Sequence, residues 1–254
     1  MPVISNTKVT MLPNGIEIAA GNISGIKNSG YSGQNTAVGT SYEAVTRLGG
    51  TRNELYSNPV GESTGQTIKV KSSSSSDVNN GGGNARRVKI KGLGPDGVEQ
   101  DENINLNGTN LVESTLNFTA VEKVIVNKVG SGGNTNAGDI TVYANDGTTA
   151  LIQSAAGEGT GGGAFGYCPA GKNLYLTQFF VSSIEEAEVG VFSRKFGTAF
   201  GVRQTMFLKD GSGNYVSEAP IQLTPGDSFE IRAKRLGSTD AKVSVDVQVF
   251  LEDQ

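Results

Sequence analysis

The sequence predicts an all-β protein built from antiparallel sheets, of the β-sandwich or jelly-roll-like kind. Apolar residues recur at every second position through most of the chain after residue 60, which is the period of a half-buried strand. Turn residues interrupt this pattern about every ten residues, and we find no convincing amphipathic helix. The composition agrees, because 36 of the 254 residues are glycine and only 18% are charged.

The first group of predicted strands lies between residues 67 and 154. A hairpin is expected over residues 85–106, because Gly94-Pro95-Asp96-Gly97 carries strong turn chemistry: proline presets φ and glycine accepts positive φ. Asn145-Asp146-Gly147 closes another hairpin in the same way. The strands expected here span residues 67–72, 85–93, 98–106, 111–118, 121–129, 139–144 and 149–154.

The segment from Val70 to Leu93, VKSSSSSDVNNGGGNARRVKIKGL, could hold a linker between domains, a disordered tail or the loop of one hairpin. Val70 and Val88 lie on predicted strands, and Val78 is the only apolar residue of the Ser/Asn/Gly run between them. The chain before Thr67 has too few apolar positions for a domain of its own. We therefore expect a long, mobile polar loop inside one sandwich.

The second group of predicted strands ends in the clearest alternation of the chain, over residues 242–251. Val243, Val245, Val247 and Val249 share one face there, which is typical of a half-buried antiparallel strand. Residues 41–48 and 184–188 are each expected to make a helical turn or two. The other strands expected here span residues 174–182, 188–195, 201–208, 215–217, 221–223 and 228–234, separated by glycine-rich turns such as residues 209–213.

These patterns predict three parts of the chain. Residues 1–60 hold scattered apolar residues without a period, and we expect an extended arm that lies across a neighbouring subunit or stays flexible. Residues 61–156 form a first β-sandwich domain and residues 157–254 a second, jelly-roll-like one. The junction falls in the glycine-rich residues 156–163.

The composition excludes several kinds of chemistry. Histidine is absent, which removes Ser-His-Asp and Cys-His catalysis and the usual general base near neutral pH. Cys168 is the single cysteine, so no intrachain disulfide or cysteine cluster is possible, and we interpret it as a small buried residue. A net charge of −4 without a basic block implies no nucleic-acid partner. No apolar run could span a bilayer, and the N-terminus lacks the pattern of a signal peptide, so we expect cytoplasmic synthesis.

Two glycine-rich motifs resemble phosphate-binding sequences. Residues 157–162 satisfy G-x-G-x-x-G, and residues 166–172 satisfy G-x-x-x-x-G-K. Both motifs need a following helix, whose N-terminus receives the phosphate. A strand pattern follows each of them here, Pro169 removes an amide donor, and Asn173 stands where magnesium needs a hydroxyl. We interpret the first as a domain junction and the second as a tight turn into a strand.

The carboxylates give no facing pair for glycoside hydrolysis. Glu185, Glu186 and Glu188 cluster in a predicted loop, where weak calcium binding is possible but a solvated loop is expected. Asp101 and Glu102 point to opposite faces of a predicted strand. The sequence therefore predicts no catalytic, cofactor-binding or metal-binding residue, and no cofactor.

Five phrases together carry a resemblance over residues 36–254. They are AVGTSYEAV with LGG, GGGNARRVKIKGLGPDGVEQDENINLNGT, VEKVIVNKVGSGGNTNAGDITV, AAGEGTGGGAFGYCPAGKNLYLTQFFVS, and FSRKFG with PIQLTPGDSFEIRAK. In this order the chain resembles a family of virion structural proteins of tailed bacteriophages, especially phages of aquatic bacteria. The resemblance implies a virion component without catalytic residues.

We therefore predict a non-enzymatic capsid decoration or cement protein, located in the virion. It would bind the major capsid protein or other virion proteins and sister subunits, with a trimer favoured. A tail or fibre adaptor or receptor-binding component is the alternative. A carbohydrate-binding module or polysaccharide-acting enzyme is a further one, and a binding module would expose aromatic platforms. The candidate platforms are Tyr143, Tyr167, Phe179 and Phe180.

Overall fold

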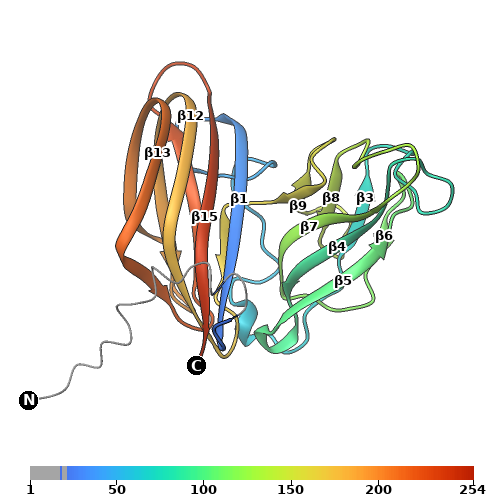
Figure 1. Cartoon of the computed structure of the whole chain (residues 1–254), viewed down its shortest axis with the longest axis horizontal. Helices are drawn as coiled ribbons and strands as arrows, with labels where there is room; N and C mark the ends of the chain where they lie inside the picture. The colour runs from blue at the N-terminus through green and yellow to red at the C-terminus, as the bar shows by residue number, and fades with distance from the viewer. Residues whose placement is uncertain (1–17, 19–21) are drawn as a thin grey trace, which may run out of the picture.

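The structure, a computed structural model, describes residue 18 and residues 22–254, apart from the side chains of residues 210 and 217–219. The described chain is almost entirely antiparallel β-structure, which confirms the predicted all-β sandwich class. Two β-sandwiches lie side by side (Figure 1). The smaller is built from the middle of the chain, and the larger combines strands from both ends.

The smaller sandwich packs two four-stranded sheets, in the orders β10-β7-β4-β5 and β6-β3-β8-β9. Alternation along these strands sends one set of side chains into a shared core, which includes Ile68, Ile90, Phe118, Val124 and Ile152. The strands are β3 (Lys69–Ser72), β4 (Ala85–Leu93), β5 (Glu99–Asn105), β6 (Val112–Glu113), β7 (Ala120–Val129), β8 (Ile140–Tyr143), β9 (Ala150–Ser154) and β10 (Thr160–Gly162).

The predicted hairpin over residues 85–106 is confirmed as β4 and β5. Its turn is the short 3₁₀ segment η3 (Pro95–Gly97), in which Asp96 has φ +64° and Gly97 has φ +72°. The strand expected over residues 111–118 is reduced to the two residues of β6, because the rest of that segment runs irregularly between the sheets.

The polar loop between β3 and β4 is anchored by a buried carboxylate. Asp77 is fully buried, and its oxygens accept hydrogen bonds from the Ser72 hydroxyl (2.6 Å) and from the amides of Ala85 (3.0 Å), Ala137 (2.9 Å) and Gly138 (3.0 Å). The loop is therefore part of the sandwich, as expected, but Asp77 ties it to the segment before β8.

The larger sandwich is one seven-stranded sheet that curls around a second core. Its order is β1-β15-β12-β14-β11, with β13 paired to β12 and β2 paired to β14. Val243, Val245, Val247 and Val249 all point into this core, as the alternation predicted. The strands are β1 (Ile26–Val38), β2 (Glu43–Ala44), β11 (Phe165–Tyr167), β12 (Lys172–Arg194), β13 (Gly201–Leu223), β14 (Ser228–Arg235) and β15 (Ala241–Asp253).

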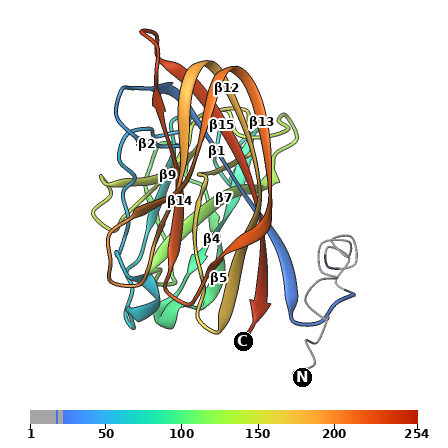
Figure 2. The ribbon, with the colours of Figure 1, turned by 90° about the vertical axis from the view of Figure 1, so that its left-hand side faces the viewer.

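The curl depends on the long hairpin of β12 and β13 (Figure 2). The first half of β12 pairs with β15 and its second half pairs with β14, so the strand passes from one layer to the other. The corner coincides with a register shift at Ser183–Glu186, where Glu185 has φ +84° and the facing Gly211 has φ +147°.

This corner overturns several sequence expectations. Residues 184–188 form no helical turn, and residues 209–213 do not end a strand, because glycine here permits a bend within β13. The separate strands expected over residues 174–195 merge into β12, and those over residues 201–223 merge into β13. Residues 41–48 likewise hold the short strand β2 instead of a helical turn.

The structure also differs from the predicted arm over residues 1–60. Residues 1–17 and 19–21 lie outside the described residues. Ile26–Val38, however, is β1, which pairs along its length with β15 as an edge strand of the larger sheet. Tyr31 and Val38 are buried in that core. The domain boundaries at residues 60 and 156 stay predictions.

Candidate functional site

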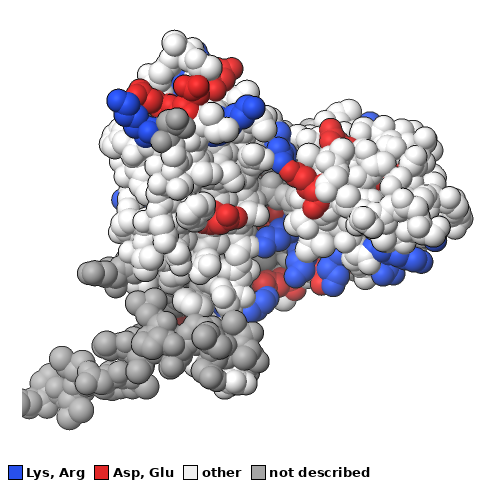
Figure 3. All heavy atoms as spheres, turned by 45° about the horizontal axis from the view of Figure 1, so that its top comes forward, with Lys and Arg blue, Asp and Glu red and all other residues white. Residues whose placement is uncertain are grey.

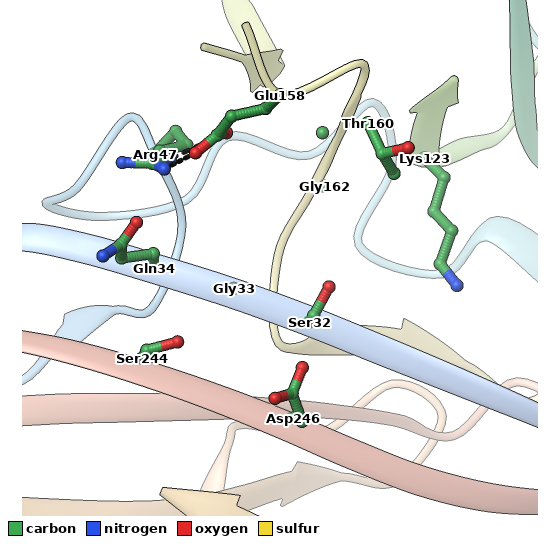
Figure 4. A pocket seen from close by; sticks show the side chains of 11 residues that line it. Ser32, Gly33, Gln34, Arg47, Lys123, Glu158, Thr160, Gly162, Ser244 and Asp246 are labelled. Atoms are coloured by element: carbon green, nitrogen blue, oxygen red, sulfur yellow. Dashed lines mark hydrogen bonds and ion pairs between the residues drawn. The ribbon is translucent and has the colours of Figure 1, made fainter. Parts of the chain in front are cut away.

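One hollow lies between the two sandwiches, with a volume of about 410 Å³ (Figure 4). One wall carries Ser32 and Gln34 from β1 and Ser244 and Asp246 from β15. The facing wall comes from residues 158–162 and from Lys123 on β7. We call this hollow the interdomain groove.

Glycines allow the chain segments around the interdomain groove to approach closely. A Cβ atom at Gly33 would lie 1.9 Å from the carbonyl oxygen of Val45, and one at Gly161 would lie 2.3 Å from that of Gln153. Both positions therefore require glycine. Within the glycine-rich residues 157–162, Gly161 and Gly162 serve this close packing, and β10 pairs with β7.

The charged groups of the groove are mostly satisfied within the protein. Arg47 forms an ion pair with Glu158 across its upper part, and the Lys123 ammonium donates to the carbonyl of Gly30. Asp246 is the single other carboxylate among the lining residues. The groove thus offers hydroxyl, amide and backbone groups, and of its two carboxylates Glu158 is already paired with Arg47.

A partly buried glutamate joins the sandwiches beside the groove. Glu122 of β7 accepts hydrogen bonds from the amide of Tyr167 (3.1 Å) and the hydroxyl of Tyr31 (3.4 Å), both in the larger sandwich. Burial raises the pKa of Glu122 from 4.5 to about 7. Burial and the neighbouring Glu122 also raise the pKa of Tyr31. This contact is therefore sensitive to pH near neutrality.

A second hollow, of about 460 Å³, continues from this contact along β4 and β5. Lys27, Lys91 and Lys123 line it together with Glu99 and Asp101. Basic side chains gather in the cleft and along the lower side of the smaller sandwich (Figure 3). Lys27 is paired with Glu99 (3.0 Å), and Asp101 with Lys89 (3.1 Å), so much of the positive charge is compensated.

Sequence reasoning missed a buried ionic network between residues 52–54 and the larger sheet. The Arg52 side chain is 3% exposed, lies 4.1 Å from the Phe165 ring centroid, and donates to Tyr167 (2.8 Å) and Glu230 (3.2 Å). Glu54 accepts from Arg52 and from Arg194 (3.0 Å). The network fixes residues 52–54 against the larger sheet. No local sequence pattern indicates this ionic network, because its residues are far apart in the sequence.

The second glycine motif, residues 166–172, is a turn that leads into a strand, as predicted. Gly171 has φ +71° and Lys172 begins β12, where it pairs with Asp253. A Cβ at Gly166 would lie 2.7 Å from Cζ of Tyr31, so packing of that ring explains this glycine. Strand β11 likewise follows the first motif.

Cys168 is buried, as predicted, and burial raises the pKa of its thiol to about 12. The glutamates near the corner do not converge: Glu188 pairs with Lys234 (2.8 Å), and Glu186 lies 4.0 Å from Lys209. Within residue 18 and residues 22–254, no group of three His, Cys, Asp or Glu side chains could hold a metal ion.

The remaining carboxylates and aromatic candidates are mostly structural. Glu102 accepts hydrogen bonds from the amides of Thr115 (2.8 Å) and Leu116 (3.0 Å). Of the four candidate platforms, Tyr167 and Phe179 are buried, Tyr143 is half-buried, and Phe180 is exposed. In the described part of the chain, no helix is long and apolar enough to cross a membrane.

Comparisons with known proteins give little. No family model matches the chain, and no curated protein matches it. A solved structure of the infectious bursal disease virus Gx strain is 11% identical over 90% of this chain and 76% of that chain, with a TM-score of 0.16. The VP2 subviral particle of the same virus is 12% identical over 89% and 76%, with a TM-score of 0.15. Scores this low carry no argument about function.

Proposed function

We propose that the chain is a non-enzymatic virion structural protein of a tailed bacteriophage, and more specifically a capsid decoration protein. It would bind the major capsid protein and sister subunits, with a trimer as the favoured assembly. The sequence resemblance over residues 36–254 supports the virion assignment. The observation that carries the assembly role is the unpaired outer edge of β13.

Strand β13 is 23 residues long and pairs on one side only, with β12. No strand of the described chain covers its other edge. Met206, Leu208, Tyr215 and Ile221 point toward the core yet remain partly exposed. Because long unpaired edges with apolar side chains tend to associate, this edge favours contact with another chain.

The outer face of β13 adds apolar surface to the same edge. Phe207 is 69% exposed, Val216 is 55% exposed and Val202 is 53% exposed. The edge lies on the side of the larger sandwich that faces away from the smaller one (Figure 1). A neighbour can therefore approach it without contacting the smaller sandwich.

The regular part of this edge is limited. The pairing of β12 with β13 shifts between Ile221 and Val216, and Pro220, which has no amide donor, lies in that stretch. Pairing with a neighbour is therefore expected within Gly201–Val216, on either side of the bend at Gly211. A confined edge of this kind favours a closed oligomer over open-ended aggregation.

The test is incorporation into particles. Phe207→Lys, on the β13 edge, should still fold but should lose its place on the virion and its self-association. Val98→Lys is the matched control, because Val98 is 57% exposed and lies in the smaller sandwich. Mass analysis of purified particles gives the copy number, and sedimentation gives the oligomeric state. Full occupancy by Phe207→Lys would contradict the assembly role of β13.

Copy number also separates the proposal from its alternative. Hundreds of copies per particle indicate a shell component, whereas a few to a few dozen indicate a tail or fibre component. The predicted arm is tested by deleting residues 1–17 alone. A deletion through residue 35 would remove most of β1, including the buried Tyr31, and would disturb the larger sheet itself.

A further inference from the structure

A small hollow lies where the segment before the smaller sandwich meets the loop between β12 and β13. Its volume is about 290 Å³, which suits a single sugar ring more than a larger ligand. The short 3₁₀ segment η2 (Pro59–Gly61) forms part of one side, and Phe196 forms the other. The lining residues are Tyr56, Ser57, Asn58, Gly61, Glu62 and Phe196.

Phe196 packs against two glycines although it is 52% exposed. A Cβ at Gly226 would lie 2.6 Å from its Cδ2 atom, and one at Gly61 would lie 3.1 Å from its Cζ atom. The ring therefore packs closely against the backbone at Gly61 and at Gly226, and Gly226 also has φ +86°. Its amide donates to Asp227 (3.1 Å), which fixes the loop. A ring that stays exposed contributes little to the stability of the fold, and a ring placed in this way suits contact with a ligand.

Several polar groups that line the hollow beside this ring have hydrogen-bond donors or acceptors without a partner in the described chain. Asn58 Oδ1 accepts from the amide of Gly197 (3.0 Å), and its Nδ2 group has no partner among the described residues. The Tyr56 hydroxyl, the Ser57 hydroxyl and the Glu62 carboxylate also have no side-chain hydrogen bond within the described chain. Donors and acceptors thus line the same hollow as the exposed Phe196 ring.

We propose that the Phe196 hollow binds a neutral saccharide, with one pyranose ring stacked on the phenyl ring. The weakly positive C–H face of a sugar is attracted to the negative face of an aromatic ring, and the sugar hydroxyls pair with amide, hydroxyl and carboxylate groups. Glu62 is the only charged side chain of the lining and disfavours anionic ligands. This site lies beyond the proposed structural role, and it uses none of the four aromatic residues that the sequence suggested.

One shallow ring contact predicts weak binding per chain, which many copies on a surface would strengthen by avidity. The experiment is saturation-transfer difference NMR on the full-length chain. The probes are maltotriose, cellotriose, mannotriose and chitotriose, each at about 10 mM, with dextran sulfate as the anionic control. At least one neutral probe should receive saturation, and dextran sulfate should not.

Phe196→Ala should reduce the affinity of the bound probe by at least about tenfold. Phe196→Leu keeps apolar volume between Gly61 and Gly226 but removes the aromatic face, so it should lose binding as well. Phe207→Ala, at an exposed phenylalanine that does not line this hollow, should bind as the wild type does. Unchanged binding in both Phe196 variants, or no transfer to any neutral probe, would overturn the proposal.

Discussion

Asp77 offers the sharpest test of how the polar loop of the smaller sandwich is held. Asp77→Ala removes the acceptor of four hydrogen bonds, donated by Ser72, Ala85, Ala137 and Gly138. Leaving a buried donor unsatisfied costs about 1–3 kcal/mol. At least the amides of Ala85 and Gly138 are buried, so we expect a loss of about 4 kcal/mol in the free energy of unfolding. Whole domains are stable by about 5–15 kcal/mol, so this loss is large.

The assay is denaturant unfolding of the full chain followed by circular dichroism, with calorimetry to separate the two sandwiches. Asp77→Asn keeps one carbonyl oxygen for Ala85 and Ala137, so it should cost clearly less than alanine. Asn80→Ala, at an exposed position of the same loop, is the matched control and should be neutral. A loss below about 1 kcal/mol for Asp77→Ala would refute the anchoring role.

Three other predictions concern buried groups. The wild-type chain should lose up to about 3 kcal/mol of stability as the pH rises from 4.5 to about 7, because the raised pKa of Glu122 makes the folded state bind more protons than the unfolded state in that window. Glu122→Gln should remove this pH dependence. If the free energy of unfolding changed with pH equally in the wild type and in Glu122→Gln between pH 4.5 and about 7, the prediction would be contradicted. Cys168, with a pKa of about 12, should resist thiol reagents at about pH 8 until the chain is unfolded, and rapid labelling of the folded chain would count against its burial. Arg52→Met should destabilise the larger sandwich by about 3–5 kcal/mol, because Glu54 and Glu230 lose a buried partner. Lys209→Met, whose side chain is 89% exposed, is the control in the same unfolding experiment, and an equal effect would argue against the network.

The two-residue alternation predicted most strands because one face of each is buried against a core. Strands β15 and β4 are examples: Val245 and Val88 both point inward, as expected. The pattern failed for β1, whose sequence IKNSGYSGQNTAV buries only Tyr31, Asn35 and Val38. An edge strand with one polar face is held by pairing with β15, and such distant pairing leaves little local signal.

Turn chemistry was informative in hairpins and misleading at the corner. Pro95, Asp96 and Gly97 close a hairpin because they join β4 directly to its partner β5, whereas Gly211 bends a strand that β12 continues to hold. Glycine permits both outcomes, and only the partner strand decides between them. The buried role of Asp77 was hidden for a similar reason, since an aspartate in a serine run is ordinarily solvated.

The candidate sites escaped prediction because each is assembled from distant segments. Phe196 is an ordinary loop residue in the sequence, and its exposed, fixed ring depends on Gly61 and Gly226. Likewise, the interdomain contact of Glu122 depends on Tyr31, which lies 91 positions earlier in the chain.

The two proposed surfaces are adjacent in the chain yet separable by experiment. The Phe196 loop joins β12 to β13, so it stands at the start of the free edge on which Phe207 lies. If the edge binds a neighbouring chain and the hollow binds a saccharide, the two substitutions should have opposite effects. Phe207→Lys should lose incorporation into particles and keep saccharide binding, whereas Phe196→Ala should do the reverse. Loss of both properties in either variant would mean that assembly and saccharide binding share one surface, and the division between edge and hollow would then be wrong.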